Sequence, residues 1–240
     1  MVATISLSFK LLQNLRLTDS VPVVRTVPGG SNLILTRVER IDPMASINAE
    51  PRIEADLGSD STRPDPTILY AMPFGGEQPQ QLVATFGSWT HRGENFFSLD
   101  FALPGGTPVL AARSGVVAIV QDSLPGGGEE GELIGKANLV VVGHSDGTLA
   151  SYAYLSTGIA VAVGDSVARG QFLGLSGSGG ALGLPHLHFH VGKRLTRAEN
   201  RTIRVLFESP TGGVHDLSEG SWCLPSRQVE RSRGRRSEGE

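Results

Sequence analysis

The sequence predicts an all-β fold with an antiparallel β-sheet core. Its 240 residues include 31 glycines and 14 prolines. These fall in clusters between short apolar runs, a pattern typical of a turn-rich β chain. Long helices are not expected. At this length the chain can bury one main core with a smaller appendage.

Residues 1–65 are predicted to form a small N-terminal β segment followed by a linker. Alternating segments such as residues 32–40 (NLILTRVER) favour strands, and a polar stretch containing Pro51, Pro64 and Pro66 follows them. The first residues lack a basic start, and Lys10 interrupts their apolar stretch. Neither a secretory signal nor a membrane span is therefore expected.

Residues 66–222 are predicted to form the β-sheet core, because short β-rich runs recur there between strong turn signals. The turn signals are glycine-containing segments at 104–106 (PGG), 125–128 (PGGG), 145–147 (SDG) and 177–180 (GSGG). The expected strands are residues 109–113, 116–120, 138–142, 149–155, 171–176 and 186–191.

Residues 223–240 are predicted to be a disordered tail. From Arg227 onward the chain mixes five arginines with glycine, serine and glutamate, and it offers almost nothing apolar to bury.

Charge and cysteine content narrow the possible functions. The formal net charge of -3 gives no basis for binding nucleic acid or an anionic membrane, since both require a basic surface. The single cysteine, Cys223, excludes an internal disulfide framework and a thiolate-rich zinc site. It is expected to be a small packed side chain. Any metal must therefore be bound by histidine and carboxylate.

Three histidines alternate with apolar residues in the segment PHLHFHV. His186, His188 and His190 share one face of the predicted strand, while the residues between them point into the core. The alternative is that they are polar side chains on a solvent face. Because three of the six histidines gather on one strand beside a glycine-rich turn, we favour a metal site.

A second polar cluster lies upstream, in HRGENFFSLDF. Asp100 stands between Leu99 and Phe101, and His91 precedes it. Burying an unpaired carboxylate costs several kcal/mol, roughly, so Asp100 should bind a cation or a hydrogen-bond donor. An ion pair with Arg113 is the alternative. Two imidazoles and one carboxylate from the two clusters would form a catalytic zinc pattern, because the fourth position stays open for water.

Several ordered motifs resemble the lysostaphin and LytM type of zinc metalloendopeptidases. The matches are His91, Asp100, GTPVLAARSGVV at 106–117, GDSVARGQFLGLSG at 164–177 and HLHF at 186–189. Together they cover roughly residues 68–195. The wide spacing between His91 and Asp100 is similar to a variant of that family.

The resemblance implies a β-sheet core of the duplicated hybrid motif type and one Zn²⁺ per chain. Its metal ligands would be His91, Asp100 and His188. His186 would be a catalytic histidine that contacts the activated water or the developing oxyanion. The implied substrate is peptidoglycan or a glycine-rich peptide, and the implied location is the cell envelope, periplasmic or extracellular.

One position departs from the family pattern. The family has Tyr-x-His-Leu where this chain has YAYL, so Tyr154 replaces the second catalytic histidine. A phenol with a pKa near 10 serves mainly as a hydrogen-bond donor, whereas histidine exchanges a proton near neutral pH. We expect Tyr154 to support an oxyanion but to be a poor base. Losing the helper costs on the order of 10²–10³ in rate if nothing substitutes.

Three other classes of protein share part of this pattern. A non-catalytic relative could bind cell-wall peptide or regulate a wall hydrolase, although the three ligands remain in place here. A lipoyl or biotin carrier would need a modifiable lysine in the GDSVARGQFLG turn, which has none. A cupin-like barrel would need a glutamate soon after His188, and the next acid is Glu199. His144 and His215 are given no catalytic role, and His190 is expected to lie behind the ligands or at the surface.

Overall fold

The computed structural model describes residues 2–59, 61–124, 137–178, 184–195, 200–209, 213 and 217–227. Regular structure in these residues is almost entirely β, apart from the short 3-10 helix η1 (Gly93–Asn95). Within this part of the chain the strands pair antiparallel, except that β6 (Leu69–Tyr70) lies parallel to β17 (Leu206–Phe207). The predicted all-β, antiparallel fold is confirmed. Among the described residues, no helix has the length and apolar character needed to cross a membrane.

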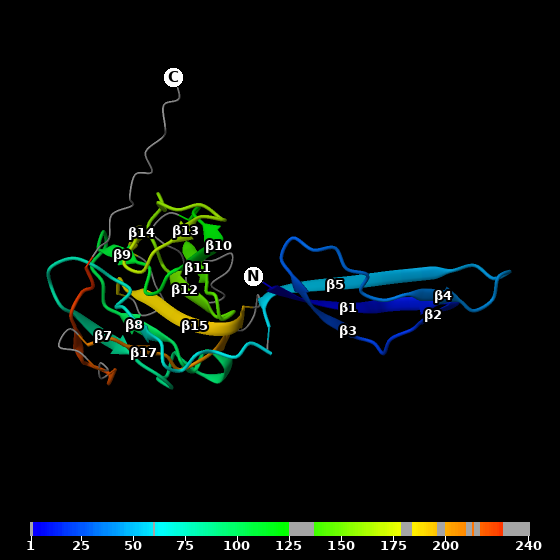
Figure 1. Ribbon diagram of the computed structural model, residues 1–240, viewed down its shortest axis with the longest axis horizontal. Coiled ribbons are helices and arrows are strands. Elements are labelled where there is room, and N and C mark those ends of the chain that lie inside the picture. Colours follow the sequence, from blue (N-terminus) through cyan, green and yellow to red (C-terminus); the bar gives the residue numbers. More distant parts are fainter. Residues whose placement is uncertain are drawn as a thin grey trace, which may run out of the picture.

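The main sheet has the strand order β13-β10-β11-β12-β15-β5-β1-β3 (Figure 1). Its strands in the body of the molecule are β10 (Gly115–Gln121), β11 (Leu139–Gly143), β12 (Leu149–Ala153), β13 (Ser166–Val167) and β15 (Leu187–Leu195). Shorter strands complete the body: β7 (Gln80–Ala84), β8 (Leu99–Phe101), β9 (Pro108–Leu110), β14 (Phe172–Leu175), β16 (Asn200–Thr202) and β18 (Trp222–Cys223). The predicted core strands therefore exist, with bounds shifted by a few residues.

Strand β15 lies at the centre of the body because it pairs with β12 on one side and with β8 on the other. Its two faces meet different surroundings, as alternation requires. Leu187, Phe189 and Val191 are fully buried in the main apolar core. Burying each such side chain contributes about 1.5–3 kcal/mol. The opposite face carries the histidines.

Strands β1 (Val2–Gln13), β3 (Val23–Pro28) and β5 (Asn48–Gly58) form an arm that projects from the body, with the small pair β2 (Leu15–Leu17) and β4 (Val38–Arg40) at its far end (Figure 1). β5 joins the arm to the body, because Leu57 and Gly58 pair with the end of β15. The arm and the core therefore share one continuous sheet.

The arm differs from the prediction in detail. Of residues 32–40, only Val38–Arg40 is a strand, and the polar stretch expected to be part of a linker contains β5. β5 gave no alternation signal because both faces of its outer part are exposed. Its backbone pairs with β1, and Pro51 is tolerated since its other edge is open there.

Strand β18 includes the first residue of the predicted tail. Cys223, the first residue of the expected tail, lies in β18 and is fully buried, which agrees with its expected packing role. Ordered structure thus continues past the predicted start of the tail. Residues 228–240 lie outside the described part of the chain, so the division into 1–65, 66–222 and 223–240 stays a prediction.

The junction between arm and body depends on Gly58. Its φ of +86° is unfavourable for any other residue, and an added Cβ would collide with the carbonyl oxygen of Lys193. We expect Gly58→Ala to lower the free energy of unfolding by about 3 kcal/mol. Gly30→Ala is the matched control, because φ there is +74° but the space is open. It should cost only about 1 kcal/mol. Equal losses in urea unfolding would contradict this account of the junction.

Candidate metal centre

Sheet register brings His188 and Asp100 together. In the pairing of β15 with β8, His188 lies directly opposite Asp100. The Nδ1 atom of His188 is 2.8 Å from Oδ1 of Asp100. Since Leu99 and Phe101 point into the main core, Asp100 must point to the face that carries the histidines.

His91 reaches the same carboxylate from the loop that follows β7. Its backbone N–H donates to the carbonyl oxygen of Ser88, at 3.0 Å. Its ring Nδ1 donates to the carbonyl oxygen of Thr85, also at 3.0 Å, which directs Nε2 toward Asp100. Nε2 lies 3.1 Å from Oδ2 of Asp100. The potential ligand atoms of His91, Asp100 and His188 all lie within 4.8 Å of one another.

The arrangement of His91 and Asp100 requires a positive charge between the ring and the carboxylate. Because Nδ1 of His91 carries the hydrogen, the Nε2 atom of the neutral ring presents a lone pair to an acceptor-only oxygen. This Nε2 is buried and makes no aligned hydrogen bond. Two acceptor atoms that face each other attract only if a proton or a metal ion lies between them. Asp100 itself is 2% exposed, so water cannot stabilise its charge.

Electrostatics in the cluster favour the carboxylate form of Asp100. Burial opposes its ionisation, but the charges and hydrogen bonds of His188 and His91 hold the pKa of Asp100 well below its usual value. Burial also disfavours protonated His91, yet Asp100 outweighs this and raises the pKa of His91 above its ordinary 6.5. A proton on His91 and a metal ion would therefore compete for the same place, between Nε2 of His91 and the carboxylate of Asp100.

The donor set fits zinc. Two imidazole nitrogens and one carboxylate oxygen match the ligands of catalytic zinc sites, which keep a further position open. Calcium and magnesium prefer oxygen ligands throughout.

His186 lies beside the three ligand candidates and is 1% exposed. Its Nδ1 donates to the carbonyl oxygen of Leu184 at 3.0 Å, and its buried Nε2 has no hydrogen-bond partner among the residues that the structure describes. Burial lowers the pKa of His186, so the ring is neutral at pH 7 and Nε2 can accept a proton.

Tyr154 stands next to His186, with 4.9 Å between the ring centroids, and its ring is 6.3 Å from that of His188. It follows β12 and adopts a left-handed backbone conformation, with φ of 67°. Few non-glycine residues adopt this conformation, and it costs about 1–2 kcal/mol. Tyr154 is 3% exposed and packs against an apolar cluster that includes Leu139 and Ala153.

The structure excludes two alternatives that the sequence left open. Arg113 pairs with Asp146 at 2.9 Å, and so does not neutralise Asp100. His186 and His190 are 1% and 2% exposed, which excludes a solvent face and corrects the surface option for His190.

Two other histidines stand apart from the cluster. Burial lowers the pKa of His144 to about 4, and its Nδ1 donates to the carbonyl oxygen of Ser114 at 2.9 Å. His144 is therefore a neutral, structural histidine. His215 lies outside the described residues.

Sequence reasoning missed the two backbone carbonyls that orient the rings, those of Thr85 and Leu184. A carbonyl oxygen is common to every residue and leaves no signal in the sequence. It also missed the contact between His190 and His188, although the alternation of the three histidines was a signal for it.

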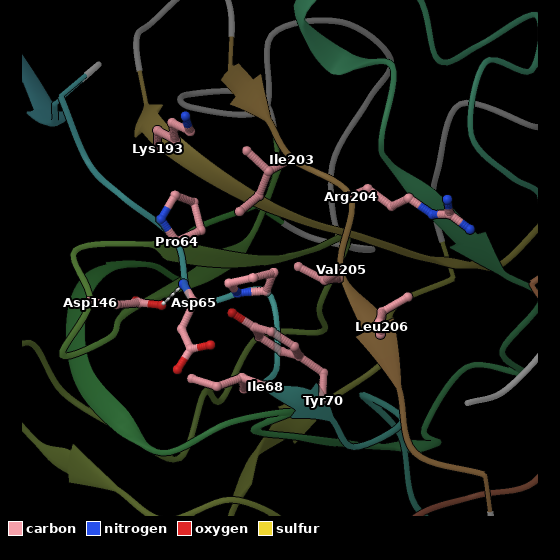
Figure 2. A pocket seen from close by; sticks show the side chains of 11 residues that line it. Pro64, Asp65, Ile68, Tyr70, Asp146, Lys193, Ile203, Arg204, Val205 and Leu206 are labelled. Carbon is pink, nitrogen blue, oxygen red and sulfur yellow. Dashed lines mark hydrogen bonds between the residues drawn. The ribbon is translucent and has the colours of Figure 1, made fainter. Parts of the chain in front are cut away.

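A pocket of about 450 Å³ lies elsewhere on the body (Figure 2). Its walls include Ile68, Tyr70, Lys193 and Val205, and none of the five predicted site residues lines it. Along β15, Lys193 falls on the opposite face from His190. The histidine cluster and this pocket are thus separate features.

Comparison with known proteins identifies a domain. Residues 95–201 match the sequence profile of peptidase family M23. This range includes Asp100, Tyr154, His186 and His188 but begins after His91, whose assignment depends on the geometry above.

Three curated relatives each match about half of the chain or less. The cell division protein DipM of Caulobacter vibrioides is 32% identical over 122 residues, 51% of this chain and 18% of DipM. The peptidoglycan DD-endopeptidase ShyA of Vibrio cholerae is 38% identical over 92 residues, 38% of this chain and 19% of ShyA. A glycyl-glycine endopeptidase of Staphylococcus capitis is 35% identical over 97 residues, 40% of this chain and 24% of that enzyme. The chain spans less than a quarter of the length of each.

Two solved structures are similar to part of the chain. A mutant of the catalytic domain of the M23 protein EnpA from Enterococcus faecalis is 28% identical, with a TM-score of 0.42, covering 56% of this chain and 94% of that domain. Lysostaphin in solution is 27% identical, with a TM-score of 0.40, covering 56% of this chain and 52% of lysostaphin.

Proposed function

The chain carries a peptidase family M23 domain in residues 95–201, and on this premise we propose that it is a zinc-dependent endopeptidase that hydrolyses peptide bonds in peptidoglycan. One observation carries the proposal. Donor atoms of the buried His91 and Asp100 and the partly buried His188 converge within 4.8 Å. Beside them lies His186, whose Nε2 has no partner among the described residues and can accept a proton. The endopeptidase names of two relatives support the substrate class.

His91, Asp100 and His188 would hold one zinc ion. Zinc bound there would lower the pKa of a water molecule toward about 7 and polarise a peptide carbonyl. The chain's own residues orient the metal ligands. The carbonyl oxygen of Thr85 fixes the ring of His91, and Asp100 lies between the two imidazoles. Fixed ligands of this kind are already in place before substrate arrives.

His186 moves the proton in this proposal. Its Nε2 accepts a proton from the attacking water and then delivers it to the leaving amine nitrogen. The hydrogen bond to the carbonyl oxygen of Leu184 keeps the hydrogen on Nδ1, so Nε2 stays available. Tyr154, next to His186, donates its phenolic hydrogen to the developing oxyanion but does not exchange protons at neutral pH.

The alternative is a weak or inactive relative that binds cell-wall peptide or regulates a wall hydrolase. Tyr154 in place of a second histidine is the observation that favours it. In either case a cell-wall peptide ligand would require the protein to lie in the cell envelope, in the periplasm or outside the cell.

The proposal is tested with purified peptidoglycan of two kinds, directly cross-linked and pentaglycine-bridged, digested by the zinc-loaded protein. Mass spectrometry of the products would show whether the stem peptide or the cross-bridge is cut. Binding to either substrate with no cut peptide bond would favour the alternative.

We expect zinc affinity to decrease as pH falls. Zinc must displace protons from the imidazoles, and the raised pKa of His91 makes this competition begin above pH 6.5. The loss should approach about tenfold per pH unit for each proton displaced. Asp100 should add nothing in this range, because its pKa is held low. Chelator competition between pH 8 and pH 5.5 measures the slope, and a flat profile would contradict the assignment of His91.

Tyr154→His is expected to raise kcat/KM by about tenfold at pH 7, because a histidine can exchange a proton where the phenol cannot. Tyr154→Phe should lower it by about tenfold, since the hydrogen-bond donor is lost. Zinc affinity should stay the same in both variants. Unchanged rates in both would mean that Tyr154 has no part in the reaction.

A further inference from the structure

His190 is a buried histidine to which the proposed reaction assigns no step. It is 2% exposed, and its Nδ1 lies 3.3 Å from Nε2 of His188. The two rings meet edge to face, with centroids 5.4 Å apart. At this distance one nitrogen carries a hydrogen and the other accepts it.

The second ring nitrogen of a metal-binding histidine requires a hydrogen-bond partner. When Nδ1 of an imidazole binds a metal, the hydrogen of the neutral ring is on Nε2. An acceptor at Nε2 fixes this tautomer and the orientation of the ring. In His188, Nδ1 faces Asp100 and Nε2 faces His190, so the two nitrogens already have separate partners.

We propose that His190 is the positioning residue for His188. Its Nδ1 accepts the Nε2 hydrogen of His188 and keeps the Nδ1 lone pair of His188 directed at the metal position. This inference rests on the proposed function, because it assigns a role to His190 within the same site. His190 acts only through His188 and touches neither substrate nor metal.

An imidazole suits this position better than a carboxylate. When Nδ1 of His188 donates to Oδ1 of Asp100, which lies 2.8 Å away, Nε2 of the same ring is an acceptor. Nδ1 of His190 can then donate, and it can accept once His188 changes tautomer. A carboxylate could only accept, and burying its charge would cost several kcal/mol, roughly. His190 can therefore form a hydrogen bond with Nε2 of His188 whether or not a metal ion is bound.

A matched control lies on the neighbouring strand. Ser151 is the direct cross-strand partner of His190 in the pairing of β12 with β15. It is 2% exposed, and its hydroxyl has no hydrogen-bond partner within the described part of the chain. Removing this hydroxyl should be nearly neutral, because no hydrogen bond is lost. Ser151→Ala thus changes the same buried face without touching His188.

The test compares zinc affinities by chelator competition. His190→Phe keeps an aromatic ring but removes the acceptor, and we expect it to weaken zinc binding about 10–100-fold. His190→Asn places an amide group near the position of Nδ1 and should recover most of this loss. Ser151→Ala should stay within about threefold of wild type. If His190 served only to fill space, Phe would be tolerated and Asn would not, which would overturn the proposal.

A second measurement does not depend on zinc or on variant folding. In ¹⁵N-labelled wild-type protein, a coupling across the hydrogen bond should connect Nε2 of His188 with Nδ1 of His190, with and without zinc. Absence of this coupling in both states would overturn the inference. If the wild type binds no zinc at all, the proposed function fails, while a detected coupling would still establish the hydrogen bond between the two rings.

Discussion

Asp100→Ala should abolish zinc binding and peptide hydrolysis together. Asp100 lies between His91 and His188, 3.1 Å from one ring nitrogen and 2.8 Å from the other. Without the carboxylate, two neutral imidazoles remain, and the site loses both a ligand and its only negative charge among these three residues. Loss of the metal removes several kcal/mol, roughly, of transition-state stabilisation. The rate should therefore fall by at least about 10³-fold.

The control for this variant is Asp146→Asn. Asp146 is a partly buried carboxylate that also has nitrogen-bearing partners, since it pairs with Arg113 at 2.9 Å. Its pKa is lowered to about 2 by the hydrogen bonds of Arg113 and Thr148, which outweigh burial. Removing its charge should cost stability but leave zinc binding intact. Zinc stoichiometry by elemental analysis distinguishes the two variants. An Asp100→Ala protein that still binds one zinc ion tightly would contradict the assignment of Asp100 as a metal ligand.

His186→Gln is the second change with a large expected effect. It should lower kcat by about 10²–10⁴-fold, because the group that accepts and delivers the proton is lost. Zinc should remain bound at wild-type affinity, since His186 is not among the three ligand candidates. Because burial lowers the pKa of His186, the acid limb of the wild-type rate profile should lie below pH 6.5, and the variant should lose this limb.

His144→Gln is a close match for this experiment. Like His186, His144 is buried, donates from Nδ1 to a backbone carbonyl oxygen and has an Nε2 that no described residue contacts by a hydrogen bond. Any general cost of replacing a buried histidine appears in both variants. If both lose activity equally at equal stability, His186 has no special role in the reaction.

Much of the site could be predicted because its residues violate the pattern of a core. Asp100 between two apolar residues and histidines at every second position of one strand cannot be explained by packing alone. The short runs between glycine clusters likewise predicted the β core. Register then supplied what sequence cannot give, the direct pairing of His188 with Asp100.

Other features left no readable signal. β5 is exposed on both faces over most of its length, so no alternation marked it, and it forms because its backbone pairs with β1. Cys223 is buried because β18 pairs with β7, a contact between segments far apart in the chain. Alternation predicted that His190 lies beside His188 on the same strand face, but it could not predict the hydrogen bond between them.

The most direct test is digestion of purified peptidoglycan by zinc-loaded wild-type protein, with the Asp100→Ala variant as control and products identified by mass spectrometry. We expect the wild type to release cut peptides and the variant to release none. A wild-type protein that binds one zinc ion per chain and cuts no peptide bond, and stays inactive as Tyr154→His, would contradict the assignment of this chain as a peptidase.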